Sequence, residues 1–214
     1  MDAGRFTALI DSFLRSSGWN TVAAGRAINE EMTGLRIFDA PLTGVASADD
    51  PAFRDLRRES VVGPHFLLPE EWLPGARSVV SFFLPFSENV RRANRADRDE
   101  PAPEWLHGRI EGQECIDRLS AFLVERLLEE GFDAVAPSVD ERFRSCTTTN
   151  TVFLDGDGAP LPVSFNSNWS ERHVAYVCGL GSFGLSKGLI TPKGVAGRFG
   201  SVVTSAPIPP DNVV

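Results

Sequence analysis

The chain has 214 residues, of which 42% are hydrophobic, and its formal net charge is −8 at pH 7. A chain of this length and composition is expected to bury roughly 70% of its unfolded surface, which excludes disorder over most of it. The negative charge excludes non-specific binding to nucleic acid or to an anionic membrane, since both need a basic face. No apolar run approaches the length of a membrane span, and no basic segment leads into an apolar one at the start. We therefore expect a cytoplasmic protein.

The first half of the chain predicts two main helices and one buried strand. Phe6–Ser16 is expected to form an amphipathic helix, and Asp50 and Pro51 are expected to cap and open a short one. Ala76–Leu84 is apolar and rich in β-branched and aromatic residues, which predicts a strand buried on both faces. Glu88–Pro103 is charged and expected to be exposed. Trp105–Glu130 is predicted to be a long helix whose buried residues are Ile110, Cys115, Ile116, Leu119, Phe122, Leu123, Leu127 and Leu128.

The second half alternates short elements less regularly. The expected elements are a short strand over Asp133–Pro137, a hairpin over Thr151–Val163, a helix over Ser170–Cys178 capped by Ser170, and a strand pair formed by Leu185–Thr191 and Phe199–Ser205. The irregular order favours an α+β layered fold over a doubly wound one. Residues 1–206 are expected to form one domain that begins with a helical segment over 1–34. Residues 207–214 are expected to form a proline-rich, loosely held tail.

Cysteine and histidine residues are sparse. Cys115, Cys146 and Cys178 include no CxxC pair, so no zinc or iron–sulfur ligand set is expected in this chain, and the three thiols are expected to be reduced and structural. His173 has two open interpretations, a packing residue or part of a pocket wall.

A glycine motif lies near the C-terminus. Gly179–Gly184 matches G-x-G-x-x-G, but a helix is expected before it and an extended segment after it, the reverse of the order in a dinucleotide-binding fold. Two interpretations remain open: a tight helix-to-strand turn, or a backbone surface that a flat ligand approaches closely. If the second holds, a branched side chain at Gly181 should block the ligand.

The wider segment resembles a known family. Residues 167–185 read SNWSERHVAYVCGLGSFGL, and GLIT at 188–191 and GRFGSVV at 197–203 follow. This run resembles the epoxyqueuosine reductase family and its relatives, the corrinoid-dependent reductive dehalogenases. Weaker matches are PGARSVV at 74–80 with LPF at 84–86, and WLHGRIEGQ at 105–113, so that the resemblance covers roughly residues 35–205.

The resemblance implies a fold similar to flavin nitroreductases, with helices around a mostly antiparallel sheet. It also implies a bound cobamide, held with its lower base detached against the glycine turn. A ferredoxin-like module with two [4Fe–4S] clusters normally follows in this family, at the position where residues 207–214 end this chain. The resemblance therefore implies a ferredoxin-like electron donor, either a downstream module or a separate protein.

The site implied by the resemblance contains the glycine turn and parts of its neighbours. Its cofactor-binding residues would be Asn168, Trp169, Ser170, Arg172, Gly179, Leu180, Gly181, Ser182, Phe183, Gly184, Leu185, Ser186, Gly200, Ser201 and Thr204. No metal ligand and no catalytic residue is assigned. The family's proton-donating aspartate would fall at Phe165 or Asn166, neither of which is an acid, so a substrate other than epoxyqueuosine is expected. A non-catalytic corrinoid or flavin carrier, or a structural domain with a vestigial pocket, are the alternatives.

Overall fold

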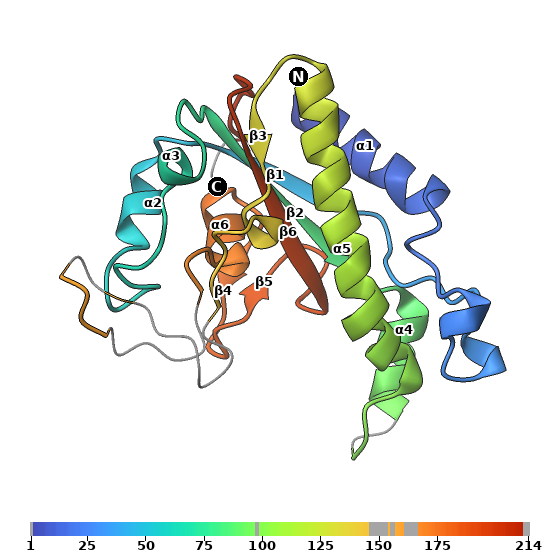
Figure 1. Ribbon diagram of the computed structural model, residues 1–214. Coiled ribbons are helices and arrows are strands. Elements are labelled where there is room, and N and C mark those ends of the chain that lie inside the picture. Colours follow the sequence, from blue (N-terminus) through green and yellow to red (C-terminus); the bar gives the residue numbers. More distant parts are fainter. Residues whose placement is uncertain (1, 97–98, 146–153, 155–156, 161–166, 212–214) are drawn as a thin grey trace.

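A four-stranded sheet with the order β1–β2–β6–β3 organises this computed structural model (Figure 1). The structure describes residues 2–96, 99–145, 154, 157–160 and 167–211. The strands are β1 (Leu42–Ser47), β2 (Ser78–Pro85), β6 (Gly197–Thr204) and β3 (Ala134–Val135). Every neighbouring pair is antiparallel, which confirms the expected α+β class with an antiparallel sheet. Both β2, predicted as Ala76–Leu84, and β3, predicted within Asp133–Pro137, are confirmed.

The centre of the sheet is buried on both faces. Along β2, Val80, Phe82 and Leu84 point into one hydrophobic cluster, whereas Val79 and Phe83 point to the other face. This alternation is the two-residue period of a strand, and β6 continues it with Val202 on the first face and Val203 on the second. Every residue of β2 is buried, as its apolar sequence predicts.

The first face of the sheet is covered by long helices. The helices α1 (Ala3–Ser16) and α5 (Pro103–Glu129) lie across it, and α4 (Glu88–Ala96) packs against the start of α5 (Figure 1). Two members of the predicted stripe of α5 are wrong, because Ile110 and Leu128 are 59% and 53% exposed. At about 100° per residue both lie well away from the face that buries Leu119 and Leu123.

The second face carries short elements. Its helices are α2 (Pro51–Asp55), α3 (Pro69–Trp72) and α6 (Glu171–Val177). The indole ring of Trp169 is stacked on Phe66 at 5.3 Å and on Phe53 at 6.4 Å, and meets the ring of Trp72 edge-on at 6.0 Å. Asp50 begins α2 as predicted, because its Oδ1 accepts a 2.8 Å hydrogen bond from the Ala52 N–H. The remaining elements are η1 (Ala24–Arg26), η2 (Glu30–Met32), η3 (Pro137–Val139), β4 (Ser182–Phe183) and β5 (Leu189–Ile190).

The predicted pairing of Leu185–Thr191 with Phe199–Ser205 is wrong. Within these segments β5 pairs with β4, and β6 pairs with β2 and β3. The reason is burial: β6 is long and apolar enough to occupy the centre of the sheet, where it gains two long-range neighbours. The two-residue β5 has an exposed Ile190 and pairs only locally.

The expected loose tail is also corrected. Ile208 is buried, and its N–H donates to the Ser78 Oγ at 3.0 Å. Asp211 lies beside the sheet edge at β1, where its N–H donates to the Val45 carbonyl oxygen and its carboxylate accepts from the Val45 N–H, both at 3.0 Å. The tail is therefore docked as far as Asp211, because it covers backbone groups that edge strand β1 would otherwise expose.

Some expectations fall wholly or partly outside the described residues. Cys146 lies outside them, and so does most of the predicted hairpin Thr151–Val163, of which the isolated bridge between Leu154 and Pro160 is described. Cys115 and Cys178 are buried free thiols whose pKa is raised by desolvation, to about 12 for Cys115. Across the described part of the chain, no helix combines the length and apolarity needed to cross a membrane.

Candidate functional site

The site is built around the C-terminal end of α6. The helix ends at Val177, and Gly179 follows with φ +76°, a left-handed conformation that strongly favours glycine. The N–H groups of Gly179 and Leu180 donate to the carbonyl oxygens of Tyr176 and Ala175 at 3.0 and 2.9 Å. Gly179 is thus a C-terminal helix cap that turns the chain sharply away from α6.

Close packing explains why the second glycine of the motif, Gly181, has no side chain. Ser182 and Phe183 of β4 pair with Ile190 and Leu189 of β5, and this brings the two backbones together beside Gly181. A Cβ on Gly181 would overlap the carbonyl oxygen of Ile190 and lie 2.8 Å from its carbonyl carbon. The motif therefore forms a tight helix-to-strand turn, and this packing accounts for glycine at position 181. A branched side chain at Gly181 would disrupt this hairpin, so its effect on a ligand could not be separated from its effect on the fold.

The hairpin presents an apolar surface. Tyr176, Phe183, Leu185 and Ile190 are exposed, and Leu185 has the accessibility of a residue with no neighbour. The Phe183 ring lies 5.7 Å from the Tyr176 ring, so the two form one continuous surface. Beside it lies a groove of about 670 Å³, whose lining residues include Tyr176, Gly179, Gly181, Ser182, Ile190 and Asp50. Exposed apolar surface next to a groove is typical of a binding site.

Charged and polar residues fasten the hairpin to α6. Arg172 donates from Nη1 to the carbonyl oxygen of Lys187 at 2.9 Å, which holds the tip of the hairpin along the helix. The His173 ring contacts the Phe183 ring at 4.8 Å and shares a 2.7 Å hydrogen bond between its Nδ1 and the Ser170 Oγ. Ser170 occupies the N-cap position, but its hydroxyl caps no backbone N–H, which corrects the predicted role. Burial and the Arg172 charge lower the pKa of His173 to about 4, so the ring is neutral at pH 7.

The predicted residues of β6 divide between the two faces of the sheet. Ser201 points toward α6, whereas a Cβ on Gly200 would meet the Phe82 ring on the opposite face. Thr204 shares the face of Gly200 by the two-residue period, and its hydroxyl donates to the Asp133 carbonyl oxygen at 2.9 Å. Of these three residues, the structure therefore brings only Ser201 toward α6 and the glycine turn.

The carboxyl group of Glu171, the first residue of α6, points toward β6 and is buried. The Ser201 hydroxyl donates to Glu171 Oε2 at 2.7 Å and accepts from the Trp169 Nε1–H at 2.9 Å. Glu171 Oε1 is buried and has no hydrogen-bond partner among the described residues. Desolvation raises the pKa of Glu171 to about 7, against the Ser201 hydrogen bond, which lowers it. An acid at the start of a helix usually indicates a solvated group that favours the helix dipole, so sequence reasoning missed this burial.

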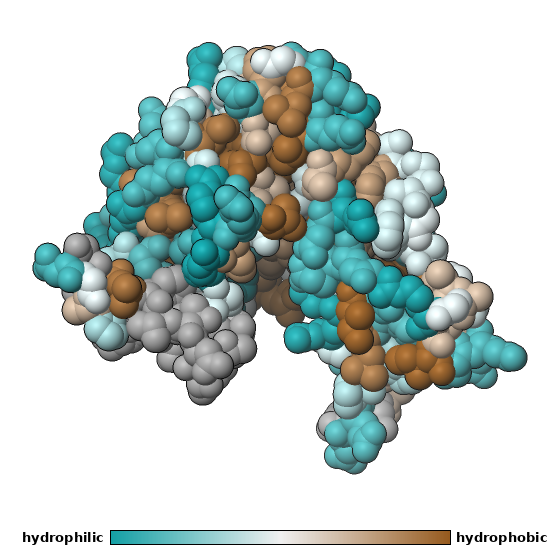
Figure 2. Space-filling view, viewed as in Figure 1, coloured by the Kyte–Doolittle hydropathy of each residue, from teal (hydrophilic) through white to brown (hydrophobic). Residues whose placement is uncertain are grey.

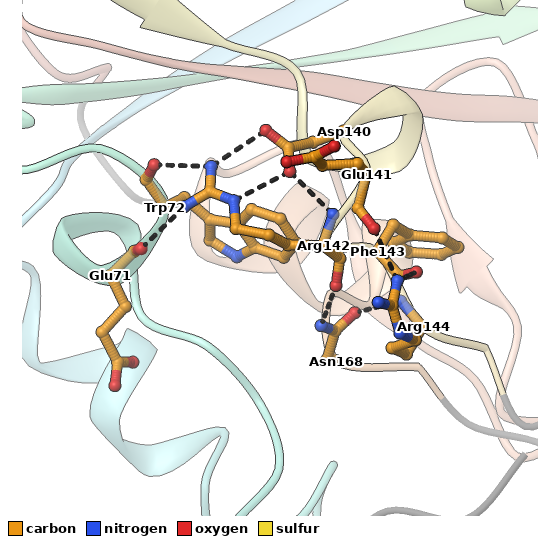
Figure 3. A network of polar contacts seen from close by, with 8 residues as sticks. All are labelled: Glu71, Trp72, Asp140, Glu141, Arg142, Phe143, Arg144 and Asn168. Atoms are coloured by element: carbon orange, nitrogen blue, oxygen red, sulfur yellow. Dashed lines mark hydrogen bonds and ion pairs between the residues drawn. The ribbon is translucent and has the colours of Figure 1, made fainter.

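Asn168 does not line the groove. It belongs to a hydrogen-bonded cluster, which we call the clasp, formed by Trp72, Asp140, Arg142, Arg144 and Asn168. Figure 3 shows the Arg142 guanidinium between the Asp140 carboxylate, at 2.8 and 2.9 Å, and the Trp72 carbonyl oxygen, at 2.9 Å. Asn168 donates to the Arg142 carbonyl oxygen and accepts from the Arg144 N–H, both at 2.9 Å. These bonds fasten two segments that lie far apart in the sequence to the end of α3. The Arg142 hydrogen bonds lower the pKa of Asp140.

A buried histidine–glutamate pair lies near the start of α5. The His107 Nδ1 and the Glu111 Oε2 are 2.8 Å apart, and Nε2 accepts from the Ile28 N–H at 3.2 Å. Both ring nitrogens are therefore used within the fold, which indicates a structural role. Across the described residues no group of three or more His, Cys, Asp or Glu side chains is placed to hold a metal ion.

Comparison with known proteins gives matches among solved structures alone. No protein-family model matches the chain, and no curated protein matches it. It is similar to a selenomethionine-labelled epoxyqueuosine reductase, at 18% identity and a TM-score of 0.49, over 100% of this chain and 49% of that one. An epoxyqueuosine reductase with an epoxyqueuosine-modified tRNA-Tyr stem loop matches at 18% identity and 0.48, over 100% and 48%. The enzyme from Bacillus subtilis matches at 18% and 0.44, over 100% and 48%. The chain spans about half the length of these structures.

Proposed function

We propose that the apolar face of the β4–β5 hairpin, with the groove beside it, binds a corrinoid, and that this chain is the corrinoid-binding redox domain of an epoxyqueuosine-reductase-like protein with a nitroreductase-like fold. The observation that carries the proposal is the exposure of Leu185, Phe183, Ile190 and Tyr176 around a glycine turn. Apolar side chains that are exposed together, next to bare backbone, favour a flat and largely apolar ligand.

The residues present fit such a group. A Cβ at Gly179 would meet no atom within 4 Å, so the backbone at this turn is open to close approach by a ring. The groove of about 670 Å³ lies within the range of about 300–1000 Å³ that is usual for cofactor sites. The sequence resemblance over 167–203, which suggested a corrinoid, includes this turn and both strands of its hairpin.

The chain's own residues would bind and shield the cofactor. Tyr176, Phe183 and Leu185 would cover one side of the ring and exclude water, and the Ser182 hydroxyl would hold a polar group at its edge. A bound corrinoid supplies a cobalt centre that accepts and donates single electrons. Those electrons would come from a ferredoxin-like donor.

The acid among the described lining residues of the groove is Asp50, and its carboxylate already caps α2. We therefore assign no proton donor. The position of the family's aspartate, at Phe165 or Asn166, lies outside the described residues, and so the substrate is not assigned.

The proposal is tested by adding cobalamin and cobinamide, each in oxidised and reduced form, to the purified protein and recording the visible spectrum. Wild type should give a saturable shift, and Leu185→Asp should weaken binding about tenfold or more, because a charge would be desolvated against the ring. The matched control is Leu106→Asp, which alters an exposed leucine of α5 on the other side of the sheet and should bind normally.

The control measurements separate the alternatives. Circular dichroism should show that both variants are folded. A wild-type protein that binds flavin mononucleotide and no corrinoid would favour the flavin carrier. If neither cofactor binds, the corrinoid proposal is wrong and the hairpin is a structural turn.

A further inference from the structure

A second apolar groove lies between α5 and the β3 edge of the sheet, and its described lining shares no residue with the groove beside the β4–β5 hairpin. It has a volume of about 720 Å³ and is bounded by α1, α5, β3 and η3. Its apolar lining includes Phe13, Trp19, Phe122, Leu128, Val135 and Val139. Figure 2 shows hydrophobic surface gathered beside the upper half of α5, next to β3. Among the residues that line the groove, Trp19, Leu128 and Val139 are exposed. Strand β3 is an edge strand of the sheet.

The wall that α5 contributes to this groove has an ordered pattern. Arg118, Ala121, Glu125 and Leu128 follow one another at intervals of three and four residues, so they lie along one side of the helix. All four are exposed. The Arg118 guanidinium lies 4.7 Å from the centre of the Trp19 ring, which adds a cation and an aromatic surface at one end of the row. Leu128 forms the other end.

This pattern is complementary to itself. Arg118 and Glu125 are equally far from a point between Ala121 and Phe122, and at a rise of about 1.5 Å per residue they lie about 10 Å apart along the axis. An antiparallel copy of α5, related by a two-fold axis that passes between the two helices beside that point, would place Arg118 opposite Glu125 twice. It would also place each Leu128 near Trp19 of the partner subunit, and the small Ala121 at the axis allows close approach of the helices.

We propose that this groove binds a second copy of this chain, with the two α5 helices antiparallel about a two-fold axis beside Ala121. An isologous contact requires the same patch to complement itself, and an apolar floor with Arg118 and Glu125 placed symmetrically along α5 meets that requirement. Glu125 also lies 3.5 Å from Arg126 of its own helix, but an exposed pair of this kind contributes little and leaves the carboxylate available. The inference does not depend on the proposed function, because the described linings of the two grooves have no residue in common.

The test is sedimentation equilibrium of the purified chain and of charge-swap variants. Wild type should dimerise, and Arg118→Glu and Glu125→Arg should each raise the dimer dissociation constant about tenfold or more, because like charges would face one another. An equimolar mixture of the two variants should recover the dimer, because the two acidic side chains of the first variant then face the two basic side chains of the second. Leu128→Asp should also give a monomer.

The control is Ile110→Asp, which places the same charge at an equally exposed position of α5 outside the groove and should dimerise like wild type. Three outcomes would overturn the proposal: a wild-type monomer at the highest soluble concentration, single variants that dimerise like wild type, or a mixture that stays monomeric. Both charged side chains are exposed, so the variants are expected to fold, which circular dichroism checks.

Discussion

The two faces of the sheet are built in different ways. On the α1–α5 face, long helices bury regular apolar stripes against Val80, Phe82 and Leu84. On the α6 face, the helices are seven residues or shorter, and a stack of aromatic rings, the Arg142 clasp and the buried Glu171 join them. Short helices are not stable by themselves, so the α6 face depends on specific polar and close contacts. The proposed binding face, the β4–β5 hairpin, lies on this side, where the chain leaves α6 through the turn at Gly179.

The largest expected effect comes from breaking the close contact between α6 and the sheet. A Cβ on Gly44 of β1 would overlap the Cys178 carbonyl oxygen at the end of α6 and lie 3.2 Å from its carbonyl carbon. Gly44→Ala should therefore lower the free energy of unfolding by about 3 kcal/mol, because backbone must move. Urea denaturation measures this. Gly25→Ala, whose Cβ would meet no atom within 4 Å, is the control and should change little. Equal effects of the two substitutions would show that the contact is not tight.

The second effect concerns pH. Glu171 is expected to titrate near pH 7 in the folded chain and near 4.5 when unfolded, so the unfolded state binds fewer protons between these values. Its contribution to stability is therefore present below pH 4.5 and falls as the pH rises to 7, by about 2–3 kcal/mol. Glu171→Gln, which resembles the protonated form, should be more stable than wild type at about pH 7.5 and similar at about pH 5.

The comparison of wild type with Glu171→Gln is needed because His173 also changes the pH dependence of stability. Its pKa is lowered to about 4 from 6.5, so its contribution rises with pH over nearly the same window and opposes that of Glu171. Because His173 is present in both proteins, its contribution cancels in the difference between wild type and Glu171→Gln. A difference that does not change with pH would mean that Glu171 is ionised and solvated in the folded chain.

The clasp gives an effect of intermediate size. Asn168→Ala removes two 2.9 Å hydrogen bonds and leaves the Arg142 carbonyl oxygen and the Arg144 N–H without their partner, which should cost about 2 kcal/mol. Asn89→Ala, at an exposed position of α4, is the matched control and should cost well under 1 kcal/mol. Thermal denaturation of both variants would reveal whether the clasp stabilises this face, and equal midpoints would exclude it.

The smallest effect tests the two helix starts against one another. Asp50 accepts from the Ala52 N–H, so Asp50→Ala should cost about 1 kcal/mol. Ser170 caps no backbone group, and Ser170→Ala should cost less than about 0.5 kcal/mol. Chemical denaturation can resolve the two, and a larger loss at Ser170 would indicate that its bond to His173 stabilises α6 more than a cap does.

The sequence alone determined the local elements of this protein. The helical stripe of α1, the apolar run of β2, the cap at Asp50 and the order of helix, glycine turn and strand all follow from residues within a few positions of one another. Side-chain direction repeats every 3.6 residues in a helix and every two in a strand, so these patterns are visible in one dimension. The glycine turn was found for the same reason.

Only the tertiary structure decided which elements meet. It paired β6 with β2 and β3 rather than with β5, docked the tail on β1 through Asp211, and enclosed Glu171 between α6 and Ser201. Each of these depends on surfaces brought together from positions 30 or more residues apart in the chain. Burial and desolvation belong to such packed surfaces rather than to any residue type, which is why the burial of the Glu171 carboxyl group cannot be read from its place at a helix start.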